Sequence, residues 1–202
     1  MVFDPAIHHR RSIRVKGYDY GQPGLYFITI CTQGRVCLLG QIRNGQVLLN
    51  EDGEMVQKTW LELRTHLASI ETDEMVVMPN HLHGIIVLLR PIAGDRRALE
   101  LGPPQTIGKE GRAQRPAPTI SLGDVVHRFK SLTTARYRNG VVPRQWPAFP
   151  GRLWQRNYYE HIIRDGHELD SVRRYIHDNP VRWEFDRENP DAKSVDNLDP
   201  WL

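Results

Sequence analysis

Apolar and polar positions in the first third of the chain predict strands followed by a helix. Residues 24–32 (GLYFITICT) are rich in β-branched and aromatic side chains, which favour a strand. Residues 34–42 and 46–50 predict a hairpin and a short third strand, with the turn sequence Arg-Asn-Gly between them. Residues 51–70 predict a helix, because their apolar side chains recur at near-helical spacing.

The alternation of strands and helices continues beyond this helix. Residues 73–79 and 81–90 predict two strands that meet at a Pro-Asn bend, and residues 153–164 predict another strand. Residues 121–140 and 165–180 predict helices, each beginning with a side chain that can cap the first turn. This order of elements predicts an α+β domain in which helices pack on an antiparallel sheet.

The segment 91–120 breaks the pattern, because it is rich in glycine, proline and charge and has little periodicity. We interpret it as a flexible insertion on the surface and not as a domain boundary. Residues 1–190 are therefore predicted to form a single domain that contains this insertion, and residues 191–202 to form an irregular tail.

The composition fits a soluble globular protein with one sizeable core, since 40% of the 202 residues are hydrophobic and 25% are charged. No apolar run approaches the length of a membrane span, and residues 1–16 lack the apolar core of a signal peptide. We therefore expect a cytoplasmic protein without a membrane partner. The two cysteines, Cys31 and Cys37, form no CxxC pair, which argues against a thiolate zinc site and favours reduced thiols.

Positive charge is unevenly distributed, although the net charge is only +3. Residues 127–164 contain eight Lys or Arg and a single acid, Glu160, with aromatic residues interleaved. Such a segment suits a polyanion with stackable bases, although an ordinary solvated surface can have the same composition. The candidate nucleic-acid-binding residues are Arg10, Arg11, Arg14, Lys16, Arg128, Lys130, Arg156 and Tyr158.

Two histidines, His81 and His83, begin the apolar strand 81–90. Residues i and i+2 of a strand point to the same face, so the two imidazoles lie side by side and can converge on one metal ion. Buried histidines are also common as hydrogen-bonded core residues, and the spacing alone leaves both interpretations open. Both faces of this strand are apolar, which predicts a central strand covered on both sides.

The predicted helix 165–180 offers a third ligand. Tyr175 and Asn179 are separated by four residues and lie at the border of its apolar stripe. A helix packed on the sheet by this stripe would hold a hydroxyl and an amide oxygen towards the histidines. Two imidazoles and one amide leave a divalent cation its full charge, which suits a phosphate ligand, and a tyrosine hydroxyl beside it can attack phosphorus.

These motifs resemble a known family. The sequence MPNHLHGII (78–86), followed by RRYIHDNPVRW (173–183), resembles the HUH-type single-tyrosine transposases similar to insertion sequence 200, and within them most closely the REP-associated tyrosine transposases. The segments LYFITICT, FKS and LWQRNYYEHIIRD resemble the same group. The resemblance covers nearly the whole chain except residues 92–118 and the last dozen.

The resemblance implies a fold, an activity and a role for each matching residue. The fold would be a ferredoxin-like (RRM-like) α+β structure, an antiparallel sheet with helices packed on one face. His81, His83 and Asn179 would bind Mg²⁺ or Mn²⁺, and Tyr175 would be the nucleophile. Asn179 stands where relatives often have glutamine, so its helix would have to approach the strand more closely.

The implied enzyme is a metal-dependent endonuclease and strand transferase. It would cleave and rejoin single-stranded DNA at hairpin-associated (REP-like) sites through a 5′-phosphotyrosine intermediate. It would act as a monomer or a homodimer.

Alternatives are open for both the catalytic residues and the function. Tyr159 and His161 share a face of the predicted strand 153–164 and form a second candidate catalytic pair. A zinc-dependent hydrolase could use His161 with His81 and His83, and a module that binds nucleic acid without catalysis is also compatible with the sequence. Only the transposase chemistry forms a covalent protein–DNA adduct, so trapping such an adduct separates the three.

Overall fold

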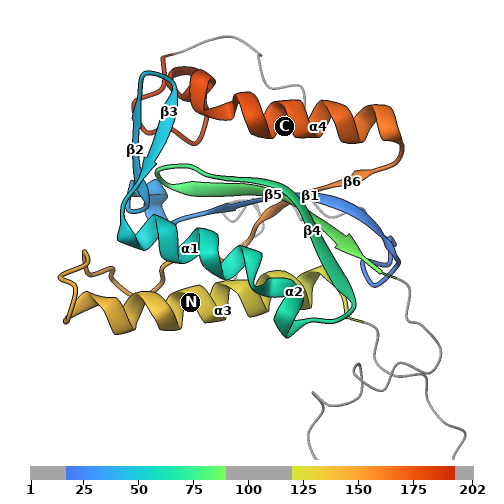
Figure 1. The fold of residues 1–202 in the computed structure, drawn as a ribbon, viewed down its shortest axis with the longest axis horizontal. Helices are drawn as coiled ribbons and strands as arrows, with labels where there is room; N and C mark the ends of the chain where they lie inside the picture. Colours follow the sequence, from blue (N-terminus) through green and yellow to red (C-terminus); the bar gives the residue numbers. More distant parts are fainter. Residues whose placement is uncertain (1–16, 90–119, 194–202) are drawn as a thin grey trace, which may run out of the picture.

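A four-stranded antiparallel sheet lies at the centre of the protein (Figure 1). The computed structural model describes residues 17–89 and 120–193. The strands are β1 (Gly24–Cys31), β4 (Ile70–Val77), β5 (His81–Leu88) and β6 (Tyr159–Ile163), in the spatial order β4-β5-β1-β6. The following predictions lie outside the described residues: the insertion up to residue 119, the tail from residue 194, and the basic residues Arg10, Arg11, Arg14 and Lys16.

The helices form two layers, one on each face of the sheet (Figure 1). The helices α1 (Glu51–Leu61), α2 (Leu63–His66) and α3 (Leu122–Val141) lie on one face, and α4 (Gly166–Asp178) lies on the other. The predicted α+β class is confirmed, and the strand order with α1 and α3 as crossover helices is the ferredoxin-like arrangement.

One detail of that prediction is corrected, because helices cover both faces and not one. Val172 and Ile176 of α4 pack against Phe27, Ile85 and Ile163 of the sheet and form a second hydrophobic cluster. The physical reason is that β5 carries apolar side chains on both faces, so each face has to be removed from water.

The predicted caps are present, and the predicted hairpin is shorter than residues 34–42 and 46–50 suggested. Ser121 forms a capping box with Asp124 at the start of α3, and Asp165 accepts a hydrogen bond from the Glu168 backbone at the start of α4. The strands β2 (Gly40–Arg43) and β3 (Gln46–Leu49) pair in a separate two-stranded sheet. Two short 3-10 helices complete the described chain, η1 (Gln33–Arg35) after β1 and η3 (Asn179–Phe185) after α4.

Two further expectations from the sequence can be compared with the described residues. The strand predicted over residues 153–164 is shorter, since only Tyr159–Ile163 joins the sheet. Cys31 and Cys37 are free thiols.

Of the helices within residues 17–89 and 120–193, none has both the length and the apolar character needed to cross a membrane.

The larger hydrophobic cluster lies between the sheet and the layer of α1 and α3. Trp60 of α1 is fully buried and meets Phe129 of α3 edge-on, with the ring centroids 5.5 Å apart. Gly84 of β5 allows this ring to reach the sheet, because a Cβ atom at that position would lie 2.5 Å from Trp60 Cζ2. The contact fixes the strand that carries the histidine pair against the helix layer.

We expect Gly84→Ala to destabilise the protein by about 1–3 kcal/mol, because the added methyl group forces the Trp60 ring to move in a well-packed core. Urea unfolding followed by circular dichroism measures the change. Gly166→Ala is the matched control, since a Cβ at Gly166 meets nothing within 4 Å. Equal stability of the two variants would show that the Trp60 contact does not constrain β5.

Candidate metal centre

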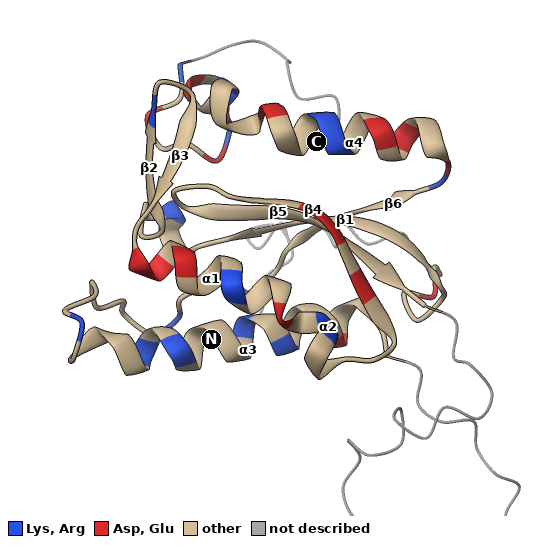
Figure 2. Cartoon of the chain, in the orientation of Figure 1, with Lys and Arg blue, Asp and Glu red and all other residues tan. Residues whose placement is uncertain are grey.

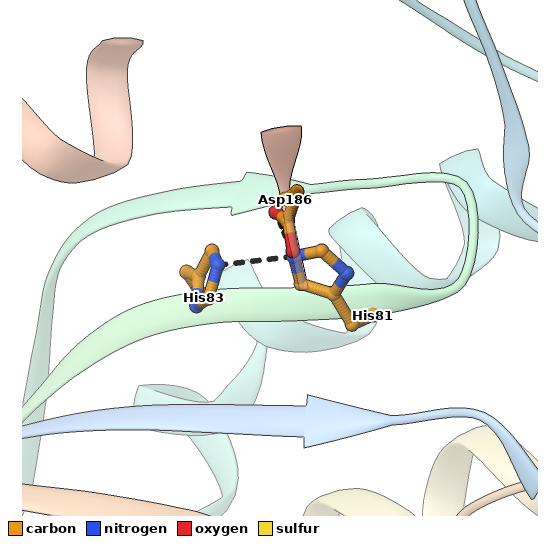
Figure 3. A group of neighbouring side chains, drawn as sticks. All are labelled: His81, His83 and Asp186. Carbon is orange, nitrogen blue, oxygen red and sulfur yellow. Dashed lines mark hydrogen bonds and ion pairs between the residues drawn. The ribbon is translucent and has the colours of Figure 1, made fainter. Parts of the chain in front are cut away.

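The strand β5 holds His81 and His83 on the same face as Ile85, which packs against Val172 and Ile176 of α4. Both residues are buried, with relative exposures of 0% and 1%. Their Nε2 atoms face each other at 3.0 Å, and the ring centroids lie 4.5 Å apart (Figure 3). The two imidazoles therefore converge on a single point.

The buried amide of Asn80 determines which nitrogen of His81 carries a proton. Asn80 Nδ2 donates to the backbone carbonyls of Arg35 at 3.0 Å and Glu188 at 2.6 Å. Both carbonyls are acceptors, so the amide must turn its NH2 group towards them. The atom that lies 2.9 Å from His81 Nδ1 is therefore the amide oxygen. An amide oxygen can only accept, so Nδ1 donates and Nε2 keeps its lone pair.

His83 is oriented in a similar way by β1. Thr29 Oγ1 lies 2.8 Å from His83 Nδ1 and can either donate to it or accept its proton. In the first case His83 Nε2–H donates to His81 Nε2 at 3.0 Å, and in the second case both Nε2 lone pairs are directed at a metal ion between them. Burial lowers the pKa of both histidines, and the charge of His81 lowers the pKa of His83 further. Both rings are therefore neutral near pH 7, and the neutral ring is the form in which imidazole binds a metal.

The helix α4 is held over this face by packing and by an ion pair. Arg173 donates from Nε to Asp73 Oδ1 at 2.9 Å and from Nη2 to Asp73 Oδ2 at 2.6 Å, which ties α4 to β4. A bidentate pair of this kind fixes orientation as well as distance. With Val172 and Ile176 buried against the sheet, the side of α4 that carries Tyr175 is turned towards the histidines.

Tyr175 and Asn179 lie next to the histidine pair. The Tyr175 ring centroid is 5.2 Å from that of His83 and 5.8 Å from that of Phe27. Asn179 is 3% exposed. Its side chain lies close enough to His81 to raise the pKa of that ring. Asn179 Oδ1 is nevertheless not aligned to accept a hydrogen bond from any described residue. It is a buried oxygen that faces the site without a donor.

Asp186, which follows η3, completes the group and is the residue that the sequence did not reveal. Its Oδ2 lies 3.6 Å from His81 Nε2, and its side chain is 5% exposed (Figure 3). Like Asn179 Oδ1, this oxygen has no hydrogen-bond donor among the described residues. Asp186 lies beyond Pro180 in irregular chain, where no helical or strand period relates it to β5.

These side chains fit a divalent cation. The donor atoms of His81, His83 and Asp186 all lie within 4.8 Å of one another. Ligands about 2.1 Å from one ion are separated by about 3.0–3.4 Å when they are adjacent in octahedral or tetrahedral geometry. The observed separations of 3.0 Å and 3.6 Å are close to these values. Two imidazole lone pairs beside two donor-free buried oxygens form a mixed nitrogen–oxygen site that could hold a metal ion.

The alternative pair, Tyr159 and His161, lies on β6 outside this group. His161 Nε2 is 2.6 Å from Glu168 Oε1, and the strand register places Phe27 of β1 between His161 and Ile85 of β5. Among the described histidines, cysteines and acids, the only cluster suited to a metal is His81, His83 and Asp186, so the three-histidine zinc site is not assembled.

Four of the predicted nucleic-acid-binding residues, Arg128, Lys130, Arg156 and Tyr158, lie within the described chain. Figure 2 shows Lys and Arg gathered along α3, and Arg128 and Arg156 are exposed. Lys130 instead donates to the carbonyls of residues 155–157 at 2.9, 3.4 and 2.9 Å and lies 5.5 Å from the Tyr158 ring centroid. Burial lowers the pKa of Lys130 to about 8. Lys130 therefore holds this loop, and DNA contacts by Arg128, Lys130, Arg156 and Tyr158 stay a prediction.

The fold and the site together define a ferredoxin-like α+β protein with a buried two-histidine donor set. The chain belongs to the same family as an uncharacterised protein of Haemophilus influenzae (strain ATCC 51907 / DSM 11121 / KW20 / Rd). The two are 40% identical over 188 residues, which cover 92% of this chain and 96% of that protein. No protein-family model matches the sequence.

Two solved structures show a similar arrangement of the chain. One is a REP-associated tyrosine transposase bound to a REP hairpin, with 17% identity and a TM-score of 0.47 over 86% of this chain and 74% of that one. The other is a Deinococcus radiodurans R1 protein provisionally assigned as a transposase, with 18% identity and a TM-score of 0.40 over 82% of this chain and 96% of that one.

We expect Asn80→Ala to lower the affinity for Mn²⁺ by about 10–100-fold, because His81 loses the partner that fixes its tautomer. The substitution also leaves two carbonyls unpaired and should destabilise the protein by about 2–4 kcal/mol. Calorimetric titration with Mn²⁺ and urea unfolding measure the two effects.

Asn50→Ala is the control, since Asn50 caps α1 and donates to Leu38 O at 2.8 Å. It should cost about 1–2 kcal/mol of stability without changing metal affinity. Unchanged Mn²⁺ affinity in Asn80→Ala would show that the amide has only a structural role.

Proposed function

We propose that this protein is a metal-dependent tyrosine transposase that cleaves and rejoins single-stranded DNA at hairpin-associated sites. The observation that carries the proposal is the position of the Tyr175 ring, 5.2 Å from His83, beside a buried set of nitrogen and oxygen donors. The MPNHLHGII and RRYIHDNPVRW motifs, which resemble the HUH single-tyrosine transposases, supply His81, His83 and Tyr175. Mg²⁺ or Mn²⁺ bound to the donors would neutralise a non-bridging phosphate oxygen.

Tyr175 would act as the nucleophile. Its hydroxyl loses a proton and attacks phosphorus, the bond from phosphorus to the 3′ oxygen breaks, and the leaving 3′ oxygen takes up a proton. The product is a phosphoester between the tyrosine and the 5′ end of the strand, which conserves the energy of the broken bond. Attack by a free 3′-hydroxyl then releases Tyr175 and rejoins the strands.

The described conformation encloses the site. His81 and His83 are at most 1% exposed, and the Trp183 ring centroid lies 6.0 Å from that of His81. A phosphate can therefore reach the donors only when the segment carrying Trp183 and Asp186 withdraws. In this account Asp186 occupies the position that a phosphate oxygen takes in the complex with DNA.

We expect Tyr175→Phe to abolish the covalent protein–DNA adduct while leaving DNA binding nearly unchanged, because the ring keeps its contacts and loses only the hydroxyl. Labelled single strands that carry hairpins, incubated with Mn²⁺ and separated under denaturing conditions, reveal the adduct. Tyr159→Phe should form it normally. An adduct that survives in Tyr175→Phe and disappears in Tyr159→Phe would identify Tyr159 of β6 as the nucleophile.

The two oxygen ligands should behave differently. Asn179→Ala should weaken Mn²⁺ binding about tenfold or more and raise the Mn²⁺ concentration for half-maximal cleavage by a similar factor. Asp186→Ala should weaken binding to the free protein but leave the requirement for cleavage nearly unchanged, since phosphate replaces that carboxylate. Mn²⁺ should support cleavage at least as well as Mg²⁺. An equal rise of the cleavage requirement in both variants would contradict the displacement of Asp186.

A further inference from the structure

An open hollow of about 650 Å³ is connected to the metal centre through the hydrogen bond between Asn80 and the Arg35 carbonyl. One wall is the η1 turn, Gln33–Arg35, and the other consists of Arg152, Gln155, Arg156 and Asn157. We refer to this hollow as the arginine groove. Arg152 and Arg156 both belong to the basic segment 127–164, but of the groove residues only Arg156 was named as a candidate nucleic-acid-binding residue.

The groove carries positive charge without a compensating acid in its lining. Three of its lining residues are arginines and none is Asp or Glu. Arg152 and Arg156 are exposed, and no acid of the described chain lies within ion-pair distance of either. Arg35 differs, because its Nε is 2.8 Å from Glu188 Oε2.

The two walls are fixed to each other and to the sheet. The backbone N–H of Gln33 donates to Leu153 O at 2.8 Å, and that of Gln155 donates to Cys31 O at 2.9 Å. The Gln155 side chain donates to Thr32 O at 3.2 Å, while Lys130 binds the carbonyls of residues 155–157 from the side of α3. The positions of the arginine backbones are therefore set before a ligand binds, which lowers the entropic cost of binding.

The groove is linked to the metal centre through Asn80. The carbonyl of Arg35 accepts a hydrogen bond from Asn80, whose oxygen lies 2.9 Å from His81 Nδ1. Glu188, which pairs with Arg35, follows two residues after Asp186 in the segment that encloses the site. A strand whose phosphate lies at the histidines thus has the arginine groove as an adjacent positive surface.

We propose that the arginine groove binds backbone phosphates of the DNA strand next to the phosphate that reacts at the metal centre. This inference rests on the proposed function. Guanidinium groups suit phosphate because their parallel N–H donors match two of its oxygens. The arginines are spread along an open hollow and do not close round a single ion, which favours a strand over a small free anion.

The test measures strand binding without cleavage. The full-length Tyr175→Phe protein is titrated against a fluorescein-labelled single-stranded oligonucleotide with a foldback hairpin, over a series of KCl concentrations. Adding Arg152→Ala and Arg156→Ala should weaken binding about tenfold. It should also reduce the slope of log affinity against log salt by about 1.4, or roughly 0.7 for each lost phosphate contact on a single strand.

The control removes the same charge elsewhere. Arg64→Ala with Arg144→Ala takes two exposed arginines from α2 and from the chain after α3, and neither residue lines the groove. The Arg144–Glu51 pair that is lost is exposed and contributes little to stability. This variant should bind the strand as the parent does. Equal weakening in both double variants, or unchanged binding in the groove variant, would overturn the proposal.

Two further measurements separate the possible explanations. Inorganic phosphate that displaces the strand at unchanged ionic strength would identify a small-anion site and overturn the strand assignment. Adduct formation is assayed separately with Tyr175 intact. An adduct formed by the protein with Tyr175 intact, together with unaffected binding in the groove variant, removes only the groove. Weakened binding in the groove variant, without any adduct formed by the protein with Tyr175 intact, removes the proposed chemistry and keeps the groove.

Discussion

The hydrogen bonds of one buried amide, Asn80, connect the parts of this protein that the site depends on. Its amino group binds a carbonyl from η1 and a carbonyl from the segment after η3, and its oxygen binds His81. Each of these partners is buried or partly buried, so an unmade bond would cost about 1–3 kcal/mol. The two carbonyls fix the amide, the amide fixes the tautomer of His81, and the tautomer turns a lone pair towards His83.

One face of the sheet packs against the larger hydrophobic cluster, and the other face carries the candidate metal centre. On one face, Trp60 and Phe129 pack the crossover helices onto β5 through the space left by Gly84. On the other face, the same strand presents the histidines to α4, which brings Tyr175 and Asn179 beside them. A central strand buried on both sides can keep its histidines in place because its backbone is hydrogen-bonded to β1 and β4. The donor geometry is thus set by a strand that is paired along both edges.

Local patterns were sufficient to predict the elements and part of the site. The spacing of His81 and His83 and of Tyr175 and Asn179 follows from strand and helix periods, and the structure brings all four together. Their catalytic and metal-binding roles stay predictions. Asp186 was not foreseen, because it lies in irregular chain after Pro180 and reaches the site only through the tertiary fold. The orienting role of Asn80 was missed for a related reason: as a turn residue it gave no sign of the two carbonyls that fix its amide.

The second helix layer shows another limit of sequence patterns. The apolar stripe of α4 predicted a packed helix, but a stripe does not state which face of the sheet receives it. The pattern of β5, apolar on both sides, already required a cover on each face. That constraint corrects the expectation of helices on one face only.

Anomalous X-ray diffraction from crystals of the full chain grown with Mn²⁺ tests directly whether the buried donors bind a metal ion. We expect one strong manganese peak between the strand and α4, about 2.0–2.3 Å from Nε2 of His81, Nε2 of His83, Oδ1 of Asn179 and Oδ2 of Asp186. The two imidazole nitrogens would then be bridged by the ion. Manganese bound only elsewhere, with the two Nε2 atoms still in direct contact, would contradict the account.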